Sequence, residues 1–347
     1  MRRSSYYPLK LADVGQSILV TGGTGSFGQT FVRYLLDHTS ARRIVIFSRD
    51  EQKQYEMEAR LTPEERARLR FFIGDVRDRE RLSMAMRDGD VVVHAAALKI
   101  VPTAEYNPFE CIQTNVFGAE NVVQAAIQTG AKKVIALSTD KAANPINLYG
   151  ASKLASDKIF VAANHLSGSS GTRFSVVRYG NVMGSRGSVL PLFQRLIREG
   201  VDSLPITDPV MTRFWINLAQ GVEFVLSCLE MMRGGETFVP KIPSMRIVDL
   251  ATALAPKLPH RVVGIRPGEK LHEIMVTVDD ARNTVDMGDR YVIEPQSHLW
   301  DQSRKSLLEM GGKAVAADFS YSSDNNSQWL DGPTLMQWIE QYGSPKS

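Results

Sequence analysis

The chain has 347 residues, and its 41 Lys and Arg against 38 Asp and Glu leave a formal net charge of only +3. So small an excess indicates neither a nucleic-acid partner nor binding to an anionic membrane, and 43% hydrophobic residues are typical of a globular protein. Two cysteines without CxxC spacing predict neither a disulfide framework nor a metal site. No apolar run reaches the roughly 18 residues of a membrane span, so we expect a cytoplasmic protein.

Short β-branched runs alternate with amphipathic segments from residue 17 onward. We predict strands at 18–20, 43–47, 70–73, 90–94, 133–137 and 174–178, and helices between them such as 29–36 and 118–129. Strand, helix and strand in regular succession predict a doubly wound α/β fold, in which a parallel sheet carries helices on both faces. After about residue 180 prolines punctuate shorter elements, and one helix is expected at 218–232. This pattern indicates a smaller, irregular α/β lobe.

A glycine-rich turn follows the first predicted strand, where the sequence reads TGGTGSFG from Thr21 to Gly28. Its glycines permit a tight turn, close approach of a pyrophosphate and close packing of helix on strand, while the N-terminus of the next helix attracts the anion. The alternative is a glycine-rich turn without a ligand. We predict dinucleotide binding by Gly22, Thr24, Gly25, Ser26, Phe27 and Gly28.

The end of the second strand indicates which dinucleotide is bound. An NAD enzyme usually has an acid there for the ribose 2'-hydroxyl, whereas this chain has Ser48, Arg49 and Lys53. A hydroxyl and two cations suit a 2'-phosphate, so NADP is favoured over NAD. Asp50 and Glu51 leave open the alternative of an ordinary charged loop.

Two later strand ends complete the predicted cofactor site. Asp75 and Val76 follow the third strand, where a carboxylate can accept from the adenine amino group or simply cap a loop. Ala95 and Ala96 follow the fourth strand and are small enough for backbone to lie against a flat cofactor. His94 has no second ligand at metal spacing, so we interpret it as a core histidine.

The residues that point to catalysis follow the fifth strand, in STDKAANPINLYGASK at 138–153. Tyr149 and Lys153 are four residues apart at the start of an expected helix, so they project from one face. An ammonium beside a phenol lowers the phenol pKa, which makes the phenolate a base for an alcohol. The alternative is an exposed helix pair.

Together these motifs resemble the extended short-chain dehydrogenase/reductase family, over roughly residues 17–290. Within it, the triplet Thr139-Asp140-Lys141, HAAALK at 94–99 and RYGNVMGSRGSVLPLF at 178–193 resemble the nucleotide-sugar dehydratases that invert C5. The resemblance implies NADP-dependent, C5-inverting 4,6-dehydration of UDP-N-acetylglucosamine to UDP-2-acetamido-2,6-dideoxy-beta-L-arabino-hex-4-ulose, a lyase reaction that opens pseudaminic acid biosynthesis.

The resemblance also implies a role for each residue. Tyr149, assisted by Lys153, removes the C4 hydroxyl proton, and Thr139 hydrogen-bonds the C4 oxygen. Lys141, with its pKa lowered by burial, takes the C5 proton, while a protonated Asp140 gives one to the departing C6 hydroxyl. For Asp140 and Lys141 the alternative is a surface turn.

The resemblance also implies substrate-binding residues, most of them in the second half of the chain. Lys99 and Asn181 correspond to positions that contact sugar or diphosphate, and Arg213, in TDPVMTR at 207–213, offers a cation to the diphosphate. In GIRPGEKLHE at 264–273, Arg266 suits a phosphate and Glu269 the ribose hydroxyls. The alternative for Asn181 is a turn residue whose side chain caps the turn, and from spacing alone the two motifs at 207–213 and 264–273 would be surface loops.

These expectations divide the chain into an N-terminal extension at 1–16, an NADP-binding Rossmann-like domain with the catalytic residues at 17–180, and a mainly substrate-binding lobe at 181–347 that is interleaved with it. The family resemblance further implies a homo-oligomer built from dimers, with a hexamer as a larger assembly. Two other functions remain open: a C5-retaining dehydratase or C4 epimerase acting on the same substrate, and a non-catalytic NADP-binding scaffold.

Overall fold

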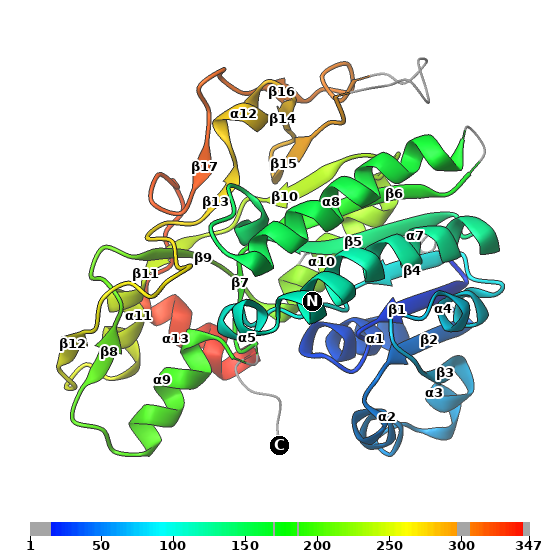
Figure 1. The fold of residues 1–347 in the computed structure, drawn as a ribbon. Helices are drawn as coiled ribbons and strands as arrows, with labels where there is room; N and C mark the ends of the chain where they lie inside the picture. The colour runs from blue at the N-terminus through cyan, green and yellow to red at the C-terminus, as the bar shows by residue number, and fades with distance from the viewer. Residues whose placement is uncertain (1–14, 169–170, 186, 297–305, 343–347) are drawn as a thin grey trace.

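The computed structural model of the chain describes residues 15–168, 171–185, 187–296 and 306–342. Its largest sheet contains β1 (Ser17–Thr21), β2 (Arg43–Ser48), β3 (Leu69–Ile73), β4 (Val91–His94), β5 (Lys133–Thr139), β6 (Arg173–Tyr179), β10 (Thr237–Pro240), β14 (Thr284–Asp286), β15 (Arg290–Ile293) and β16 (Lys313–Ala314). The strand order is β16-β14-β15-β10-β6-β5-β4-β1-β2-β3, as Figure 1 shows. From β3 to β10 all neighbours are parallel, and β15, β14 and β16 add an antiparallel edge.

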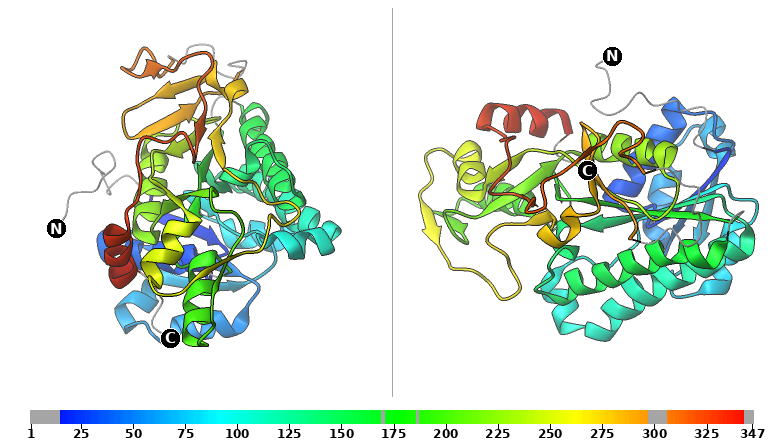
Figure 2. Two further views of the ribbon diagram at one scale, coloured as in Figure 1. Left: turned by 90° about the vertical axis from the view of Figure 1, so that its left-hand side faces the viewer. Right: turned by 90° about the horizontal axis from the view of Figure 1, so that it is seen from above.

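Helices cover both faces of this sheet. One face carries α1 (Ser26–His38) and α10 (Leu218–Met231), and the other carries α4 (Arg79–Met86), α7 (Gly118–Thr129) and α8 (Leu148–Ser167). The view from above in Figure 2 shows the sheet between these two layers. Shorter elements connect them: α2 (Glu51–Glu58), α3 (Pro63–Arg68), α5 (Val101–Tyr106), α6 (Pro108–Ile112), the π-helical turn η2 (Gln113–Phe117) and the 3-10 turn η3 (Asp140–Ala142).

The central strands β1, β2, β4, β5 and β6 are mostly buried because they pack against helices on both sides. In β1, Ile18 and Val20 lie in the core that contains Phe31 of α1, while Leu19 lies in the core that contains Phe160 of α8. Successive side chains of a strand point to opposite faces, so a strand buried on both faces needs a continuous apolar run. This is why the parallel strands could be recognised in the sequence as short runs of apolar residues.

In the part of the C-terminal lobe that the structure describes there are three small sheets, ordered β11-β9-β7, β12-β8 and β13-β17. Their strands are β7 (Asn181–Val182), β8 (Leu204–Ile206), β9 (Thr212–Ile216), β11 (Ser244–Arg246), β12 (His260–Val262), β13 (Ile274–Val276) and β17 (Tyr321–Ser322). The helices are α9 (Val189–Arg198), α11 (Ile247–Leu254), α12 (Val278–Ala281) and α13 (Gly332–Tyr342). In β9, Phe214 packs in a core of the large sheet and Trp215 in the core of the lobe, so one strand joins the two.

The predicted doubly wound α/β fold is confirmed, with β1 to β6 and helices α1, α7 and α10 at the expected places. The large sheet continues beyond residue 180, because β10 pairs in parallel with β6. The boundary at residue 180 stays a prediction, and most of the expected extension at 1–16 lies outside the described residues. Within the described ranges, no helix combines the length and apolar character needed to cross a membrane.

Gly28 allows α1 to pack closely on the turn that precedes it. A Cβ at this position would lie 2.5 Å from Gly23 Cα and 2.6 Å from Gly22 O, which are backbone atoms. We expect Gly28→Ala to displace α1 and lower the free energy of unfolding by about 1–3 kcal/mol. Urea unfolding followed by circular dichroism measures this change.

Gly221 in α10 provides a matched control, since nothing outside its own helix lies within 4 Å of its Cβ position. Gly221→Ala should raise the free energy of unfolding by about 0.5–1 kcal/mol, because alanine loses less backbone entropy than glycine in a helix. Wild-type stability of Gly28→Ala would contradict the packing argument.

Candidate active site

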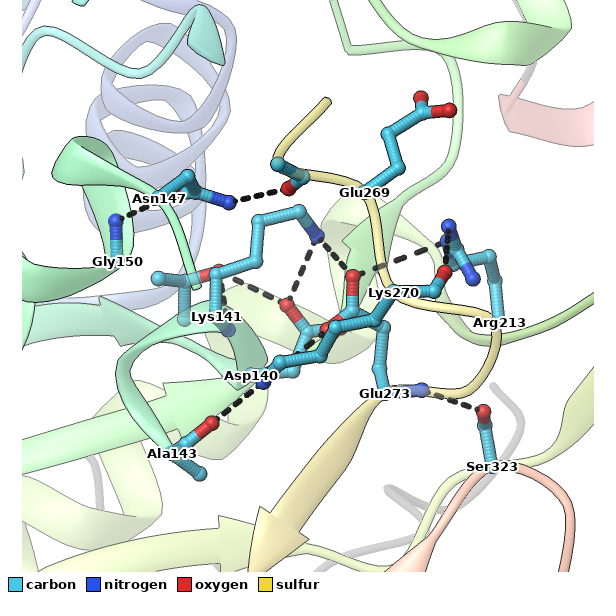
Figure 3. Close-up of polar contacts among 12 residues, drawn as sticks. Asp140, Lys141, Ala143, Asn147, Gly150, Arg213, Glu269, Lys270, Glu273 and Ser323 are labelled. Carbon is cyan, nitrogen blue, oxygen red and sulfur yellow. Dashed lines mark hydrogen bonds and ion pairs between the residues drawn. The ribbon is translucent and has the colours of Figure 1, made fainter. Parts of the chain in front are cut away.

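Three segments meet at the carboxyl end of β5, and the third is far along the chain from the other two (Figure 3). They are η3, the first turn of α8 and the segment 264–273 before β13. Asn147 joins two of them, since its side chain accepts from Gly150 N at 2.7 Å and donates to Gly268 O at 2.7 Å. A Cβ on Gly150 would lie 2.3 Å from Lys141 O, so the start of α8 packs directly on η3.

Lys141 lies between two buried carboxylates. Its Nζ is 3.1 Å from Asp140 Oδ1 and 3.0 Å from Glu273 Oε1. The side chains of these acids are 0% and 2% exposed, whereas that of Lys141 is 23% exposed. Thr139 Oγ1 donates to Asp140 Oδ1 at 2.9 Å. The ammonium therefore links η3 to the segment before β13, as Figure 3 shows.

Two further cations lie around Glu273. Arg213 Nε is 3.8 Å from Glu273 Oε1, and Lys270 Nζ is 3.9 Å from Glu273 Oε2. Both cations also bind backbone oxygens: Arg213 donates to Lys270 O at 2.9 Å, and Lys270 donates to Ala143 O at 2.6 Å. The buried carboxylate of Glu273 is therefore surrounded by positive charge.

The charges in this cluster set its protonation. Burial raises the pKa of the Asp140 carboxyl; the charge of Lys141 opposes this shift and that of Glu273 adds to it. For Lys141, burial alone lowers the pKa, but the two carboxylates outweigh it and hold the pKa above its ordinary value. The expectation of a lowered Lys141 pKa is wrong for this arrangement, because it counted burial without the second carboxylate.

Tyr149 is buried next to the same cluster. Burial raises its pKa to about 12, although the charge of Lys141 and a hydrogen bond with Thr139 act to lower it. The sequence argument expected Lys153 to lower this pKa. Lys153 is buried too, which lowers its own pKa, while the charge of Asp157 raises it. Of the charges named here, that of Lys141 acts to lower the pKa of the phenol. The assistance of Lys153 stays a prediction.

A buried acid behind Lys153 escaped the sequence analysis. Asp157 Oδ2 accepts from Ser138 Oγ at 2.8 Å and lies 3.5 Å from Arg178 Nη2. Tyr149, Lys153 and Asp157 follow one another at intervals of four along α8, so all three lie on one helix face. The same spacing that indicated the first two residues could have indicated the third.

Glu273 also escaped the sequence analysis, which singled out only Arg266 and Glu269 in the segment 264–273. No local pattern connects Glu273 with Lys141, because their contact depends on where β13 lies. His272 Nδ1 instead lies 2.8 Å from Thr212 Oγ1. Within the described residues, no group of three or more His, Cys, Asp or Glu side chains is placed to hold a metal ion.

The glycine-rich turn lies at the N-terminus of α1, and its geometry fits a pyrophosphate. Gly22 has φ +67°, and Gly25 caps α1 without a side-chain hydrogen bond, so no side chain of the cap competes with an anion for the first N–H groups. Thr21 Oγ1 accepts from Ala95 N at 3.1 Å and Ala96 N at 3.2 Å, which fixes the end of β4 beside the turn. The other predicted residues of this turn are Thr24, Ser26, Phe27 and Gly28.

The residues predicted to select NADP lie together at the ends of β2 and β3. Arg49 is 55% exposed, and its Nη1 lies 3.5 Å from Asp75 Oδ2. Arg77, which the sequence analysis missed, lies 2.8 Å from the same oxygen. Lys53 pairs with the residue that caps α2. Ser48 and Val76 are buried beside them. Asp75 is thus bound by two arginines, and its role toward adenine stays a prediction.

The predicted substrate-binding residues fall into two groups. Arg213 is 7% exposed beside the Lys141 cluster, and Asn181 lies in β7, which pairs with β9. Lys99 follows β4 on the surface, while Arg266 and Glu269 pair with each other and the Arg266 side chain is 65% exposed. The structure therefore brings Arg213 to the catalytic candidates and leaves Arg266 at the surface. Their contacts with a substrate stay predictions.

The doubly wound sheet, the glycine-rich turn and the Tyr149–Lys153 helix define a fold of the short-chain dehydrogenase/reductase class. Residues 18–295 match the model of the family described as polysaccharide biosynthesis protein. The chain belongs to this family.

Curated relatives match the chain over most of its length. The UDP-N-acetylglucosamine 4,6-dehydratase (inverting) of Campylobacter jejuni subsp. jejuni serotype O:23/36 (strain 81-176) is 58% identical over 328 residues, covering 94% of this chain and 97% of that protein. A UDP-glucose 4-epimerase of Rickettsia canadensis is 42% identical over 319 residues, covering 90% and 92%.

Solved structures share the fold. Pen from Bacillus thuringiensis has a TM-score of 0.83 and 33% identity, covering 96% of this chain and 98% of that chain. DesIV, a dTDP-glucose 4,6-dehydratase from Streptomyces venezuelae with NAD and TYD bound, has a TM-score of 0.65 and 26% identity, covering 74% and 86%. The family resemblance and the fold expected from the sequence are confirmed.

His94 is 1% exposed at the end of β4. Its Nδ1 lies 2.8 Å from Thr21 Oγ1, which already accepts from two backbone N–H groups, so the hydroxyl donates its hydrogen to the ring. The imidazole is therefore neutral, as expected of a core histidine. Burial, and then the charge of Lys153, lower its pKa to about 3.

This shift predicts a pH dependence of stability. Because the ordinary pKa is 6.5 and the folded value about 3, the unfolded chain binds an extra proton between these values, and stability falls as pH decreases. The slope from His94 is about 1.4 kcal/mol per pH unit, and His94→Gln should remove it. Urea unfolding at about pH 7.5 and about pH 5 measures the difference. Identical slopes for the two proteins would contradict a neutral, buried imidazole.

Proposed function

We propose that the protein catalyses the C5-inverting 4,6-dehydration of UDP-N-acetylglucosamine, with NADP as the cofactor. The observation that carries this proposal is the placement of Lys141 Nζ within 3.1 Å of Asp140, beside the buried Tyr149. Asp140 supplies an acid, and Lys141 and Tyr149 supply two bases, around one sugar. The 58% identity to the inverting dehydratase of Campylobacter jejuni supports the same substrate and the same product, UDP-2-acetamido-2,6-dideoxy-beta-L-arabino-hex-4-ulose.

Tyr149 takes the proton of the C4 hydroxyl, and Thr139 hydrogen-bonds the C4 oxygen. Burial raises the pKa of the Tyr149 phenol to about 12, so the phenol ionises only when other groups stabilise the phenolate. The nearby charge of Lys141 provides part of this stabilisation. When bound, NADP supplies the hydride acceptor for C4 and the hydride donor for C6. The glycine-rich turn, with Ser48, Arg49 and Lys53, holds that cofactor.

A ketone at C4 acidifies the hydrogen at C5. Lys141 in its neutral form takes this proton, and the electrons of the C5–H bond form the C5–C6 double bond. The C6–O bond breaks at the same time, and Asp140 in its protonated form, which burial favours by raising the pKa of the carboxyl, gives its proton to the departing hydroxyl, which leaves as water. Addition of the hydride at C6, and return of a proton to C5 from the face opposite to the one it left, then saturate the double bond and invert that centre. Lys141 must lose its ammonium proton before this step.

A second candidate is a C4 epimerase or a C5-retaining dehydratase, and the 42% identity to a Rickettsia canadensis UDP-glucose 4-epimerase favours the former. An epimerase leaves the C6 hydroxyl in place, so it has no need of an acid such as Asp140 at that position. A buried Asp140, whose carboxyl pKa is raised by that burial, therefore supports dehydration over epimerisation.

We place the reaction at the start of pseudaminic acid biosynthesis for surface glycans or flagellin, in the cytoplasm, and expect a homo-oligomer. Tyr106 and Phe109, on the short helices α5 and α6, are 87% and 79% exposed. Large aromatic side chains of this kind gain stability when another subunit covers them, which supports an assembly.

Proton NMR in deuterated water tests the reaction. With UDP-N-acetylglucosamine we expect a new C6 methyl signal, deuterium at C5 and an L-configured product. Tyr149→Phe should slow turnover by about 10²- to 10⁴-fold, while the exposed Tyr106→Phe serves as the matched control. Unchanged C5 configuration, a C4 epimer alone or no turnover by the wild type would refute the proposal.

Arg49 tests the choice of cofactor. Because its guanidinium suits a 2'-phosphate, Arg49→Ala should weaken NADP binding about tenfold or more and leave NAD binding nearly unchanged. Calorimetric titration of the purified protein with each dinucleotide measures both affinities. An equal loss for the two cofactors, or tighter binding of NAD by the wild type, would refute the assignment of NADP.

A further inference from the structure

Glu273 is a carboxylate to which the proposed reaction gives no task. It comes from the segment before β13, in the second half of the chain, and its side chain is 2% exposed. Its Oε1 lies 3.0 Å from Lys141 Nζ, closer than Asp140 Oδ1 at 3.1 Å. Figure 3 shows the ammonium of Lys141 contacting both acids.

The backbone around Glu273 is held by buried contacts. Glu273 N donates to Ser323 Oγ at 2.9 Å, and Ser323 N donates back to Glu273 O at 2.8 Å. The same Ser323 hydroxyl lies 2.6 Å from Thr212 Oγ1. Glu273 Oε2, by contrast, has no hydrogen-bond partner among the described residues. Burying a carboxylate with one oxygen unbonded costs stability. Buried groups that carry such a cost are typical of functional sites.

Several charged or titratable groups face Lys141. Asp140 comes from η3, Tyr149 from α8, Arg213 from β9, and Lys270 and Glu273 from the segment before β13. Within this set Arg213 lowers the pKa of Lys141 and the two acids raise it. Since burial already raises the pKa of Asp140, Glu273 is the member that most readily keeps a full negative charge, and its own pKa lies below the ordinary value.

We propose that Glu273 is a positioning residue: it holds Lys141 Nζ beside Asp140 and, as a buried counter-ion, governs when Lys141 releases its proton. This inference rests on the proposed function, in which Lys141 must be neutral to accept the C5 proton. No bond to Glu273 forms or breaks, and it exchanges no proton with the sugar.

The sign of the effect follows from charge. Glu273→Gln removes a negative charge 3.0 Å from Lys141 Nζ, so the ammonium is less stabilised and the Lys141 pKa falls. The same change lowers the pKa of Asp140, which Glu273 raises. The rising and falling limbs of the pH–rate profile for C5 exchange therefore both move to lower pH. A residue that only supports the fold would lower the rate at every pH without moving the limbs.

The closing experiment has two readouts. Protein carrying ¹³C-labelled lysine is titrated by NMR, with the Lys141 signal assigned from its loss in Lys141→Arg, and the pH profile of C5 deuterium incorporation is recorded. In Glu273→Gln we expect Lys141 to titrate about one pH unit or more below the wild type, and the profile to shift in the same direction. Glu273→Asp keeps the negative charge, so it should restore most of the wild-type Lys141 titration and most of the wild-type pH profile.

Glu236→Gln is the matched control. Glu236 is 1% exposed and accepts from Ser175 Oγ at 2.6 Å, at the other end of β6 from the candidate site. The same substitution there should leave the Lys141 titration unchanged. If Glu273→Gln does not fold, Glu273→Asp must still shift the titration measurably, because its carboxylate lies farther from Nζ.

The two proposals fail in different ways. If the wild type does not dehydrate UDP-N-acetylglucosamine, the proposed function is refuted, while the NMR titration still tests the Glu273–Lys141 coupling. If Lys141 titrates at the same pH in the wild type and both Glu273 variants, the positioning role is overturned even when turnover is normal.

Discussion

The arrangement of the candidate site depends on one ammonium group between two carboxylates that the fold brings from distant parts of the chain. Asp140 follows β5, Glu273 precedes β13, and Lys141 Nζ lies within 3.1 Å of an oxygen of each. Burying either acid alone would cost several kcal/mol, and the shared cation offsets part of that cost. Charge thus ties η3 to the segment before β13 and decides which groups carry protons there.

Hydrogen bonds reinforce this connection between the two halves. Arg178 Nη1, at the end of β6, donates to Met275 O at 2.9 Å, and Asn147 donates from the start of α8 to Gly268 O at 2.7 Å. The parallel pairing of β6 with β10 extends one sheet across the expected boundary at residue 180. The catalytic candidates therefore lie within an interlocked unit, and a change in the segment 264–273 reaches Lys141 directly.

The features that were predicted well are those that depend on local sequence patterns. Parallel strands buried on both faces read as continuous apolar runs, so β1 to β6 were placed from the sequence. Tyr149 and Lys153 share a helix face because four residues make about one turn, and Asp157 one turn further on follows the same rule. The direction of the Lys141 pKa shift was predicted wrongly, because a pKa depends on every charge within several ångströms, and Glu273 is near only in space.

The sequence by itself determined the doubly wound fold and the glycine-rich turn, since each rests on spacing within a few turns or strands. For the catalytic candidates at 139–153, spacing indicated Tyr149 and Lys153, and the family resemblance implied Thr139, Asp140 and Lys141. Only the tertiary structure decided that Glu273 partners Lys141, that Arg213 is buried beside them, and that Arg49 contacts Asp75. These contacts join residues far apart in the chain. Electrostatic interaction depends on distance and burial in three dimensions, and neither is encoded in local spacing.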